Sequence, residues 1–410
     1  MCYEVKKSEK VLEDELVDII RKRVLDEFDW AQEAKEEEIW QRIGEEITES
    51  VEWANLSIKE RTHLAQRVYN SLRRLDILQE LIEDDTVTEI MVNGPQKIFY
   101  EKDGRVFLYP YHFSSEEKLQ DVIQQIVGRH NRVVNLSSPI VDSRLENGAR
   151  VNVVLSPISI DGSSLTIRKF PNMPLTIEQL IELESITQDA AVFLKYLVKA
   201  KYNLFISGGT GSGKTTFLNI LSSFIPQNER IITIEDSAEL QLQNKCNLVR
   251  LETRNENSEG VKEITIRELI RSALRMRPDR IVVGECRGPE ALDMLQAMNT
   301  GHEGSLSTGH ANSAKDMLSR LETMVLMGND LPLYAVRQQI ASAIDIIIHL
   351  GKTRAGKRKV LEITEILEYK EGEIITQPLY QYENALQKVN ELKHKQKLER
   401  LEESECTHEL

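Results

Sequence analysis

The spacing of apolar residues changes along the chain and separates three regions. In residues 1–80, apolar side chains recur every three or four positions, as in Leu64, Val68, Leu72 and Leu75. This spacing is typical of amphipathic helices that bury one face. We therefore predict an N-terminal acidic helical bundle of three helices over residues 1–80. Its charged exterior is either a solvated face or a surface that binds a partner.

From residue 81 the pattern changes to the alternation that is typical of β-strands. Three short strands separated by turn residues are predicted: Val87–Val92, Lys97–Tyr100 and Arg105–Leu108. An amphipathic helix follows as far as Val127, and two more strands precede residue 170. We predict an α+β domain over residues 81–170. Two prolines in the next few residues predict a stiff linker at 171–174.

Residues 175–370 alternate short apolar runs with helical patterns, which is typical of an α/β domain with a parallel sheet. The predicted strands are Leu204–Ser207, Ile231–Ile234, Leu248–Leu251, Ile281–Val283 and Gly304–Thr308. In such domains ligands bind at the carboxyl ends of the strands. We also predict an edge strand at Leu361–Leu367. Residues 371–410 are predicted to form a C-terminal extension with a partly exposed helix.

A phosphate-binding motif lies in residues 203–218, NLFISGGTGSGKTTFL. It combines the spacing of a P-loop with a preceding strand and a following helix, which is the context that the motif requires. Backbone N–H groups of such a loop and of the helix N-terminus bind phosphate oxygens. In this pattern Lys214 reaches the β- and γ-phosphates and the Thr215 hydroxyl ligates Mg²⁺. The predicted nucleotide-binding residues are Gly208, Gly209, Thr210, Gly211, Ser212, Gly213, Lys214, Thr215 and Thr216.

Carboxylates follow two of the predicted strands, at the edge of the sheet where the P-loop lies. Glu239 lies shortly after the strand Ile231–Ile234, and Glu285 follows Ile281–Val283 after one glycine. Phosphoryl transfer needs acidic groups that hold Mg²⁺ and orient the nucleophile. We therefore predict that both glutamates are functional. A Walker B strand ordinarily ends in Asp; because Gly284 takes that place, we expect contact of Glu285 with Mg²⁺ through water, or contact from the Asp236 side.

Two histidines occur in the glycine-rich segment 301–312, GHEGSLSTGHAN. A lone histidine is more often structural than catalytic, but two beside a nucleotide-binding domain suggest that His302 and His310 sense the γ-phosphate. The segment has no carboxylate or cysteine spacing that would indicate zinc.

Arginines are concentrated in two regions. Arg267, Arg271 and Arg275 share one helix face, and Arg250 and Arg254 lie upstream. They could form a nucleic-acid stripe or supply arginine fingers across a subunit interface. Glutamates interspersed among them favour the interface.

Three further arginines lie in the predicted α+β domain: Arg144, Arg150 and Arg168. Arginine binds phosphate through a planar pair of donors. The alternative is that these residues form surface ion pairs, which the residues alone favour.

The composition narrows the class of protein. The chain of 410 residues has a formal net charge of −14, which disfavours stable nucleic-acid binding driven by phosphate neutralisation. Its four cysteines are far apart and contain no CxxC pair, so neither a zinc knuckle nor a disulfide framework is expected. No apolar run approaches the ~18 residues of a membrane span, and the N-terminus has no apolar signal core. These features predict a cytoplasmic location.

Four motifs in this order resemble those of a known family. GGTGSGKTT, ITIEDSAELQL, RPDRIVVGECRGPEA and GHEGSLSTGHAN are similar to the Walker A motif, Asp box, Walker B motif and His box of secretion ATPases. That superfamily drives type II secretion, type IV pili and type IV secretion. RLETRNENSEG, LIRSALRMRPDR and VTEIMVNGPQKIFYEKDGRV resemble the CpaF/Tad branch in particular. The resemblance covers residues 60–370, and Cys286 departs from it where an aliphatic residue or Met is expected.

The resemblance implies a RecA-like P-loop ATPase domain, preceded by the α+β domain and the helical bundle. It implies a homohexamer that hydrolyses ATP with Mg²⁺ and acts at the cytoplasmic membrane through an inner-membrane platform protein. It makes Glu239 the water-activating base, Glu285 the Walker B acid, and His302 and His310 sensors. It also places three arginines near the phosphates or at a domain clamp, and two more at contacts from a neighbouring subunit: Arg144, Arg150 and Arg168, then Arg250 and Arg254.

The function expected from this resemblance is to power assembly of a Tad/Flp-type pilus, or related secretion. Two alternatives stay open. One is a conjugation-like type IV secretion ATPase with DNA as cargo, and the other is a nucleotide-gated assembly switch with little turnover. Neither the cargo nor the direction of transport follows from the residues.

Overall fold

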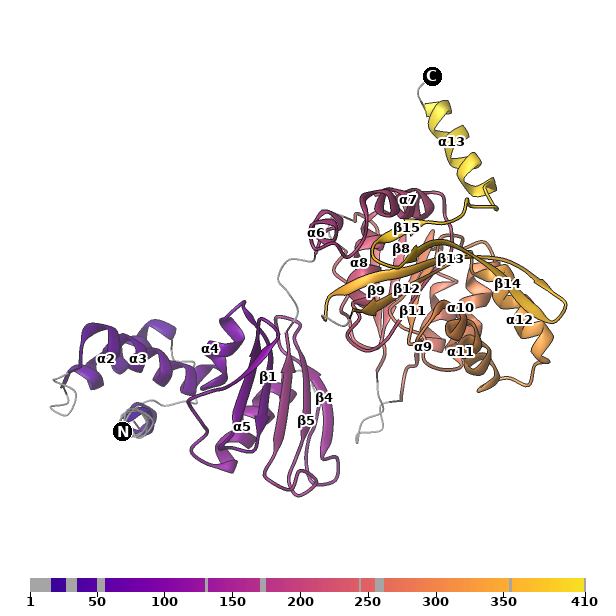
Figure 1. Ribbon diagram of the computed structural model, residues 1–410. Coiled ribbons are helices and arrows are strands. Elements are labelled where there is room, and N and C mark those ends of the chain that lie inside the picture. The colour runs from indigo at the N-terminus through magenta and orange to yellow at the C-terminus, as the bar shows by residue number, and fades with distance from the viewer. Residues whose placement is uncertain are drawn as a thin grey trace. The chain divides into compact units, whose positions relative to one another are not determined.

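The computed structural model describes residues 16–26, 35–49, 56–129, 132–169, 175–242, 245–254, 262–353 and 356–408 (Figure 1). The chain folds as two compact units, residues 1–172 and 173–410. The predicted linker at 171–174 lies outside the described residues. Within the described part of the chain, no helix is both long and apolar enough to cross a membrane.

Three helices at the start of the first unit share one apolar core. They are residues 16–26, α2 (Glu36–Glu49) and α3 (Ile58–Arg73). The core is formed by Val17, Ile20, Val24, Ile39, Ile43, Ile47, Leu64, Val68 and Tyr69. α3 begins with a capping box, in which the Ser57 side chain and Glu60 bond to each other's backbone N–H groups. The helical spacing of apolar residues therefore predicted these packed faces.

The rest of the first unit is a six-stranded antiparallel sheet with two helices. The strand order is β3-β2-β1-β6-β5-β4. The strands are β1 (Val87–Asn93), β2 (Ile98–Lys102), β3 (Arg105–Leu108), β4 (Ile140–Arg144), β5 (Arg150–Val154) and β6 (Ser164–Arg168). The helices are α4 (Leu78–Glu83) and α5 (Glu116–Gly128). Because Leu78 and Leu81 pack in the core of the sheet, this part begins before the predicted boundary at residue 81.

The second unit is built on a nine-stranded sheet in the order β15-β14-β13-β12-β7-β11-β10-β8-β9. Six of its strands are parallel: β7 (Leu204–Gly208), β8 (Ile231–Glu235), β9 (Leu248–Glu252), β10 (Arg280–Val283), β11 (Leu306–Gly309) and β12 (Ile346–Lys352). The five predicted strands are all present. β12 is additional, and it forms because a run of three isoleucines at 346–348 is fully buried beside β7.

Helices cover both faces of this sheet and define two apolar cores (Figure 1). One core includes α7 (Gln188–Lys199) and α8 (Lys214–Ser223), with the short α6 (Ile177–Glu182) packed at its margin. The other includes α9 (Ile266–Ala273), α10 (Glu290–Asn299), α11 (Ala314–Leu326) and α12 (Leu333–Ala343). This is the α/β arrangement that the alternation of strands and helices predicted, and it agrees with the RecA-like domain that the family resemblance implies.

The sheet continues beyond the predicted end of the domain at residue 370. β13 (Arg358–Lys370), β14 (Glu373–Tyr382) and β15 (Leu386–Lys388) extend it with antiparallel pairs. The prediction of an edge strand at Leu361–Leu367 was therefore wrong, because β14 covers β13. Among the described residues of the extension predicted for 371–410, the helix is α13 (Gln396–His408). Its Leu398 and Leu401 pack against the core.

Candidate nucleotide site

The P-loop follows β7 and ends at the first turn of α8. Gly211 and Gly213 have φ angles of +68° and +96°, a conformation that side-chain-bearing residues rarely adopt. Gly213 caps α8 without a side-chain hydrogen bond, and the helix begins at Lys214. The first N–H groups of α8 have no partner within the helix. These N–H groups therefore indicate an anion-binding site at the carboxyl end of β7.

The hairpin of β12 and β13 approaches the P-loop closely. A Cβ atom on Gly208 would lie 2.6 Å from the carbonyl oxygen of Leu350, so only glycine fits there. Arg358 donates from Nε to the Gly211 carbonyl at 2.9 Å, and Lys352 lies beside the same glycine. The hairpin therefore brings two cations to the loop. Neither was among the predicted site residues, since they are more than a hundred positions away in the sequence.

Lys214, His310 and Glu285 form a contiguous polar row at the carboxyl ends of β7, β11 and β10. The Lys214 ammonium lies 3.2 Å from Nδ1 of His310. Nε2 of His310 lies 2.8 Å from Oε1 of Glu285. Lys214 also donates to the Gly209 carbonyl at 3.3 Å. The structure thus brings together three of the predicted site residues that the sequence separates by up to 96 positions.

Burial lowers the pKa of Lys214, and the charges of Glu285 and Glu239 oppose that shift. Burial also lowers the pKa of His310, opposed by Glu285 and reinforced by Lys214. A neutral His310 is thereby favoured at pH 7. In that form Nδ1 can accept a hydrogen bond from the Lys214 ammonium, while Nε2 carries the ring hydrogen and lies beside Oε1 of Glu285, which makes no hydrogen bond among the described residues.

Arg287 completes the environment of Glu285 and was missed by the sequence analysis. Its Nε and one terminal nitrogen lie 2.8 and 2.6 Å from Oε2 of Glu285, while its other terminal nitrogen lies 3.6 Å from Asp236. This fork holds the Glu285 carboxylate in place. The available signal was an arginine two residues beyond the Walker B glutamate.

Glu235, the last residue of β8, organises the loop that carries Glu239. Its buried Oε1 accepts the backbone N–H groups of Glu239 at 2.9 Å and Leu240 at 3.0 Å. Burial raises the pKa of Glu235 to about 7. The carboxyl group therefore fixes the start of the loop after β8. Glu235 was not among the predicted site residues.

His302 precedes β11, so the structure does not bring this predicted sensor to the P-loop of its own unit. Its carbonyl accepts from Ser305 just before β11 begins, whereas His310 follows the end of that strand. Asn203, which precedes β7, bonds to the N–H groups of Gly304 and Ser305. The P-loop follows the opposite end of β7. Because the strands are parallel, His302 is separated from the phosphate site of its own unit by the length of a strand.

The arginines fall into separate environments. In the first unit, β-sheet register places Arg144 opposite Arg150, and Arg150 opposite Arg168. These three therefore form one row across β4, β5 and β6, whose role stays a prediction. Arg250 is exposed on the edge strand β9, and Arg254 donates to the Lys262 carbonyl.

The predicted arginine stripe on α9 is engaged inside its own unit. Arg267 and Arg271 each donate to the buried Asp293 at 2.8 Å. These two guanidinium groups have a partner without a nucleic acid or a neighbouring subunit. The third member, Arg275, lies beyond the end of α9 and is exposed, so the prediction that all three share one helix face was wrong.

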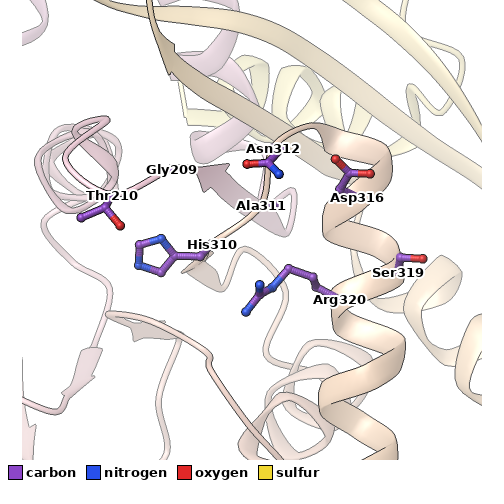
Figure 2. Close-up of a pocket in the computed structure, with 8 residues that line it drawn as sticks. All are labelled: Gly209, Thr210, His310, Ala311, Asn312, Asp316, Ser319 and Arg320. Carbon is purple, nitrogen blue, oxygen red and sulfur yellow. The ribbon is translucent and has the colours of Figure 1, made fainter.

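A pocket of about 480 Å³ lies between the P-loop and α11. Figure 2 shows His310, Asn312 and Arg320 around it. The complete lining is Gly209, Thr210, His310, Ala311, Asn312, Asp316, Ser319 and Arg320. Its volume is in the range of small-molecule sites.

The residues present fit ATP with Mg²⁺. The buried Ser212 hydroxyl oxygen has no hydrogen-bond partner within the described residues. Thr215, which also carries a hydroxyl, is the second residue of α8 and follows Lys214. Glu285 supplies a carboxylate at the same edge. This set has the ammonium, hydroxyl and carboxylate groups that a P-loop uses toward nucleotide and metal.

Known proteins are similar to this chain in sequence and in fold. The family model described as Type II/IV secretion system protein matches residues 72–401. A Mycobacterium tuberculosis relative, named provisionally as a conjugal transfer protein, is 34% identical over 73% of this chain and 86% of its own length. The type IV secretion system protein VirB11 of Bartonella quintana is 31% identical over 71% of this chain and 92% of its own.

Among solved structures, the Legionella pneumophila ATPase DotB superposes with a TM-score of 0.53 at 22% identity. The alignment covers 72% of this chain and 80% of that one, which shows a shared fold. Together with the P-loop and the row of Lys214, His310 and Glu285, the match over most of the sequence settles the family. The chain belongs to the Type II/IV secretion system protein family and is a secretion ATPase.

Proposed function

We propose that this chain is a hexameric motor that hydrolyses ATP to power assembly of a Tad/Flp-type pilus or related secretion across the cytoplasmic membrane. The proposal that the chain hydrolyses ATP is supported chiefly by the row of Lys214, His310 and Glu285 beside the P-loop. The CpaF/Tad assignment rests on the sequence segments that resemble that branch. The proposed partners are identical subunits and an inner-membrane platform protein, through which the motor associates with the membrane.

In the proposed site, the P-loop backbone and Lys214 bind the β- and γ-phosphates. Thr215 and Glu285 would hold Mg²⁺, with Glu285 acting through water; the bound metal would neutralise charge on the phosphate oxygens. Glu239 is the proposed water-activating base. Its backbone is held by Glu235, and its charge acts on Lys214, so it belongs to the same electrostatic site.

The hexamer is proposed to complete this site with arginines. Arg250 and Arg254 lie at the exposed edge of the sheet, where a neighbouring subunit could be reached. Arg144, Arg150 and Arg168 form a row that is suited to phosphate or to a clamp between domains.

The second candidate is a conjugation-like type IV secretion ATPase. It is favoured by the conjugal-transfer name of the Mycobacterium tuberculosis relative and by the likeness to VirB11. The formal net charge of −14 disfavours DNA as a directly bound cargo. Tight, salt-sensitive DNA binding would favour this candidate over the first.

The test is the ATPase rate per chain as a function of protein concentration, with light scattering to measure mass. Wild type is expected to become active as a hexamer forms, and Lys214→Ala to be inactive while folded. Glu239→Gln is expected to bind ATP and hardly turn it over. A monomer with a constant rate would contradict the inter-subunit arginines, and turnover in Lys214→Ala would contradict the site itself. Nucleotide binding without turnover in wild type would support the assembly switch.

A further inference from the structure

Arg320 projects from α11 into the pocket beside the P-loop. Figure 2 shows its side chain extending toward His310, with Asn312 and Thr210 on other sides of the same space. Within the described part of the chain, Arg320 makes no hydrogen bond or ion pair. An arginine whose five donors are not engaged by protein is available for an anionic ligand.

The pocket adjoins the end of the P-loop that faces the terminal phosphate. His310 lines it and lies 3.2 Å from the Lys214 ammonium, the group that reaches the β- and γ-phosphates in a P-loop. The α-phosphate side is instead served by the N-terminus of α8. A ligand that extends from Lys214 into the pocket therefore presents its terminal phosphate toward Arg320.

The charged side chains that line the pocket are compatible with a terminal phosphate that points toward Arg320. Arg320 and His310 line the same pocket, so an anion bound there would lie near both side chains. Asp316 lies one turn earlier on α11 and also lines the pocket. It forms no ion pair with Arg320 among the described residues, which leaves the guanidinium as the counter-charge for an incoming anion.

We propose that Arg320 is a ligand of the γ-phosphate within the same subunit and discriminates ATP from ADP. This inference rests on the proposed ATPase function and adds a specificity residue to it. A planar guanidinium can form two parallel bonds to phosphate oxygens. ADP lacks the phosphate that would fill the pocket, so Arg320 contributes to the affinity for ATP and hardly to that for ADP.

The experiment compares binding of ADP and of the non-hydrolysable analogue AMP-PNP to full-length wild type, Arg320→Ala and Arg320→Lys. Isothermal titration calorimetry is done with Mg²⁺ and at one protein concentration, with the mass checked by light scattering. Lys315→Ala is the matched control, because Lys315 is an exposed cation on the same helix that does not line the pocket.

Arg320→Ala is expected to weaken the binding of AMP-PNP about 10-fold or more, the scale of a lost charge-assisted hydrogen bond. The affinity for ADP is expected to stay within about two-fold of wild type. Arg320→Lys should recover part of the loss, because it keeps the charge without the fork. Equal losses for both nucleotides, or none for either, would overturn the proposal. If the melting temperature of Arg320→Ala falls below that of wild type, Arg320→Gln is measured in its place.

The role of Arg320 and the proposed ATPase function can be disproved separately. If wild type binds both nucleotides and Arg320→Ala binds them unchanged, only the role of Arg320 is lost. If wild type binds neither, and behaves as Lys214→Ala does, the proposed function falls and this inference falls with it.

Discussion

The Lys214 ammonium lies 3.2 Å from Nδ1 of His310, across 96 residues of sequence. Since the other ring nitrogen contacts Glu285, His310 links the phosphate-binding lysine to the acidic side of the site. We predict that His310→Ala lowers kcat for ATP hydrolysis by about 10- to 100-fold, the scale of a lost positioned polar group. The measurement is steady-state ATPase activity.

His302→Ala is the comparison for that prediction. His302 lies at the far edge of the sheet, so its loss is expected to leave kcat within about two-fold, as for most substitutions remote from a site. Equal losses in the two variants would contradict the separation of the two histidines described above.

Glu235 predicts a pH-dependent stability. Its pKa is raised to about 7 from 4.5 by burial, so the folded state keeps a proton that the unfolded chain has lost. The stability that Glu235 contributes is complete below pH 4.5 and is lost as the pH rises through 7. Glu235→Gln should therefore match wild type near pH 4.5. Above pH 7 the free energy of unfolding of Glu235→Gln should exceed that of wild type by up to roughly 3 kcal/mol.

Denaturant unfolding of both proteins at a series of pH values measures this difference. A constant difference between wild type and Glu235→Gln across the series would show that the buried carboxyl group does not titrate in this range. Glu235→Ala is a second variant, since it also removes the acceptor for Glu239 and Leu240. It should lose ATPase activity that Glu235→Gln retains.

Cys286 is predicted to be inert although it follows the Walker B glutamate. The thiol is fully buried beside the Ser307 hydroxyl, and burial raises its pKa to about 12. Only the thiolate reacts with alkylating agents. Iodoacetamide at pH 8 should modify the exposed Cys246 and spare Cys286 until the protein is denatured, as read by mass spectrometry. Early labelling of Cys286 would contradict its burial.

Arg280 is predicted to be a major determinant of stability in the second unit. It is completely buried, and its Nε lies 2.5 Å from the Glu229 carboxylate. It also donates to the carbonyls of Gly304 and Val198. Arg280→Ala leaves the Glu229 carboxylate only its longer ion pair with Lys201, at 3.7 Å. Loss of one partner from a buried ion pair costs about 3–5 kcal/mol.

Arg275→Ala is the control for Arg280, because Arg275 is an exposed arginine a few residues upstream. It should change the free energy of unfolding by less than about 0.5 kcal/mol. Both variants are measured by denaturant unfolding. A small effect for Arg280→Ala would mean that Glu229 finds solvent or another donor.

The sequence predicted most parallel strands because each is a short continuous apolar run, such as Ile231–Ile234. It did not predict β4, where Asp142 and Ser143 interrupt the apolar alternation, or β14, which carries Gln377 and Pro378. Both strands form through pairing with neighbours, which local patterns do not encode.

For the site, local motifs sufficed for the P-loop, but long-range contacts did not follow from them. Two histidines eight positions apart look equivalent in the sequence, yet they flank opposite ends of β11. Arg287, Glu235 and Arg320 resemble ordinary surface or strand-end charges until folding places them beside Glu285, Glu239 and the P-loop. Each owes its role to a contact rather than to a motif.

The order of strands in the second sheet has a consequence for synthesis of the chain. Among the described strands, β7 is hydrogen-bonded to β11 on one side and β12 on the other, with Leu204 opposite Leu306 and Ile346. A ribosome therefore makes the P-loop strand long before either neighbour exists. Parallel pairing over such separations is slow to form. A nascent or prematurely terminated chain that stops before β12 carries the whole P-loop motif and still lacks one of the two neighbours of β7, together with the hairpin that contacts Gly208 and Gly211.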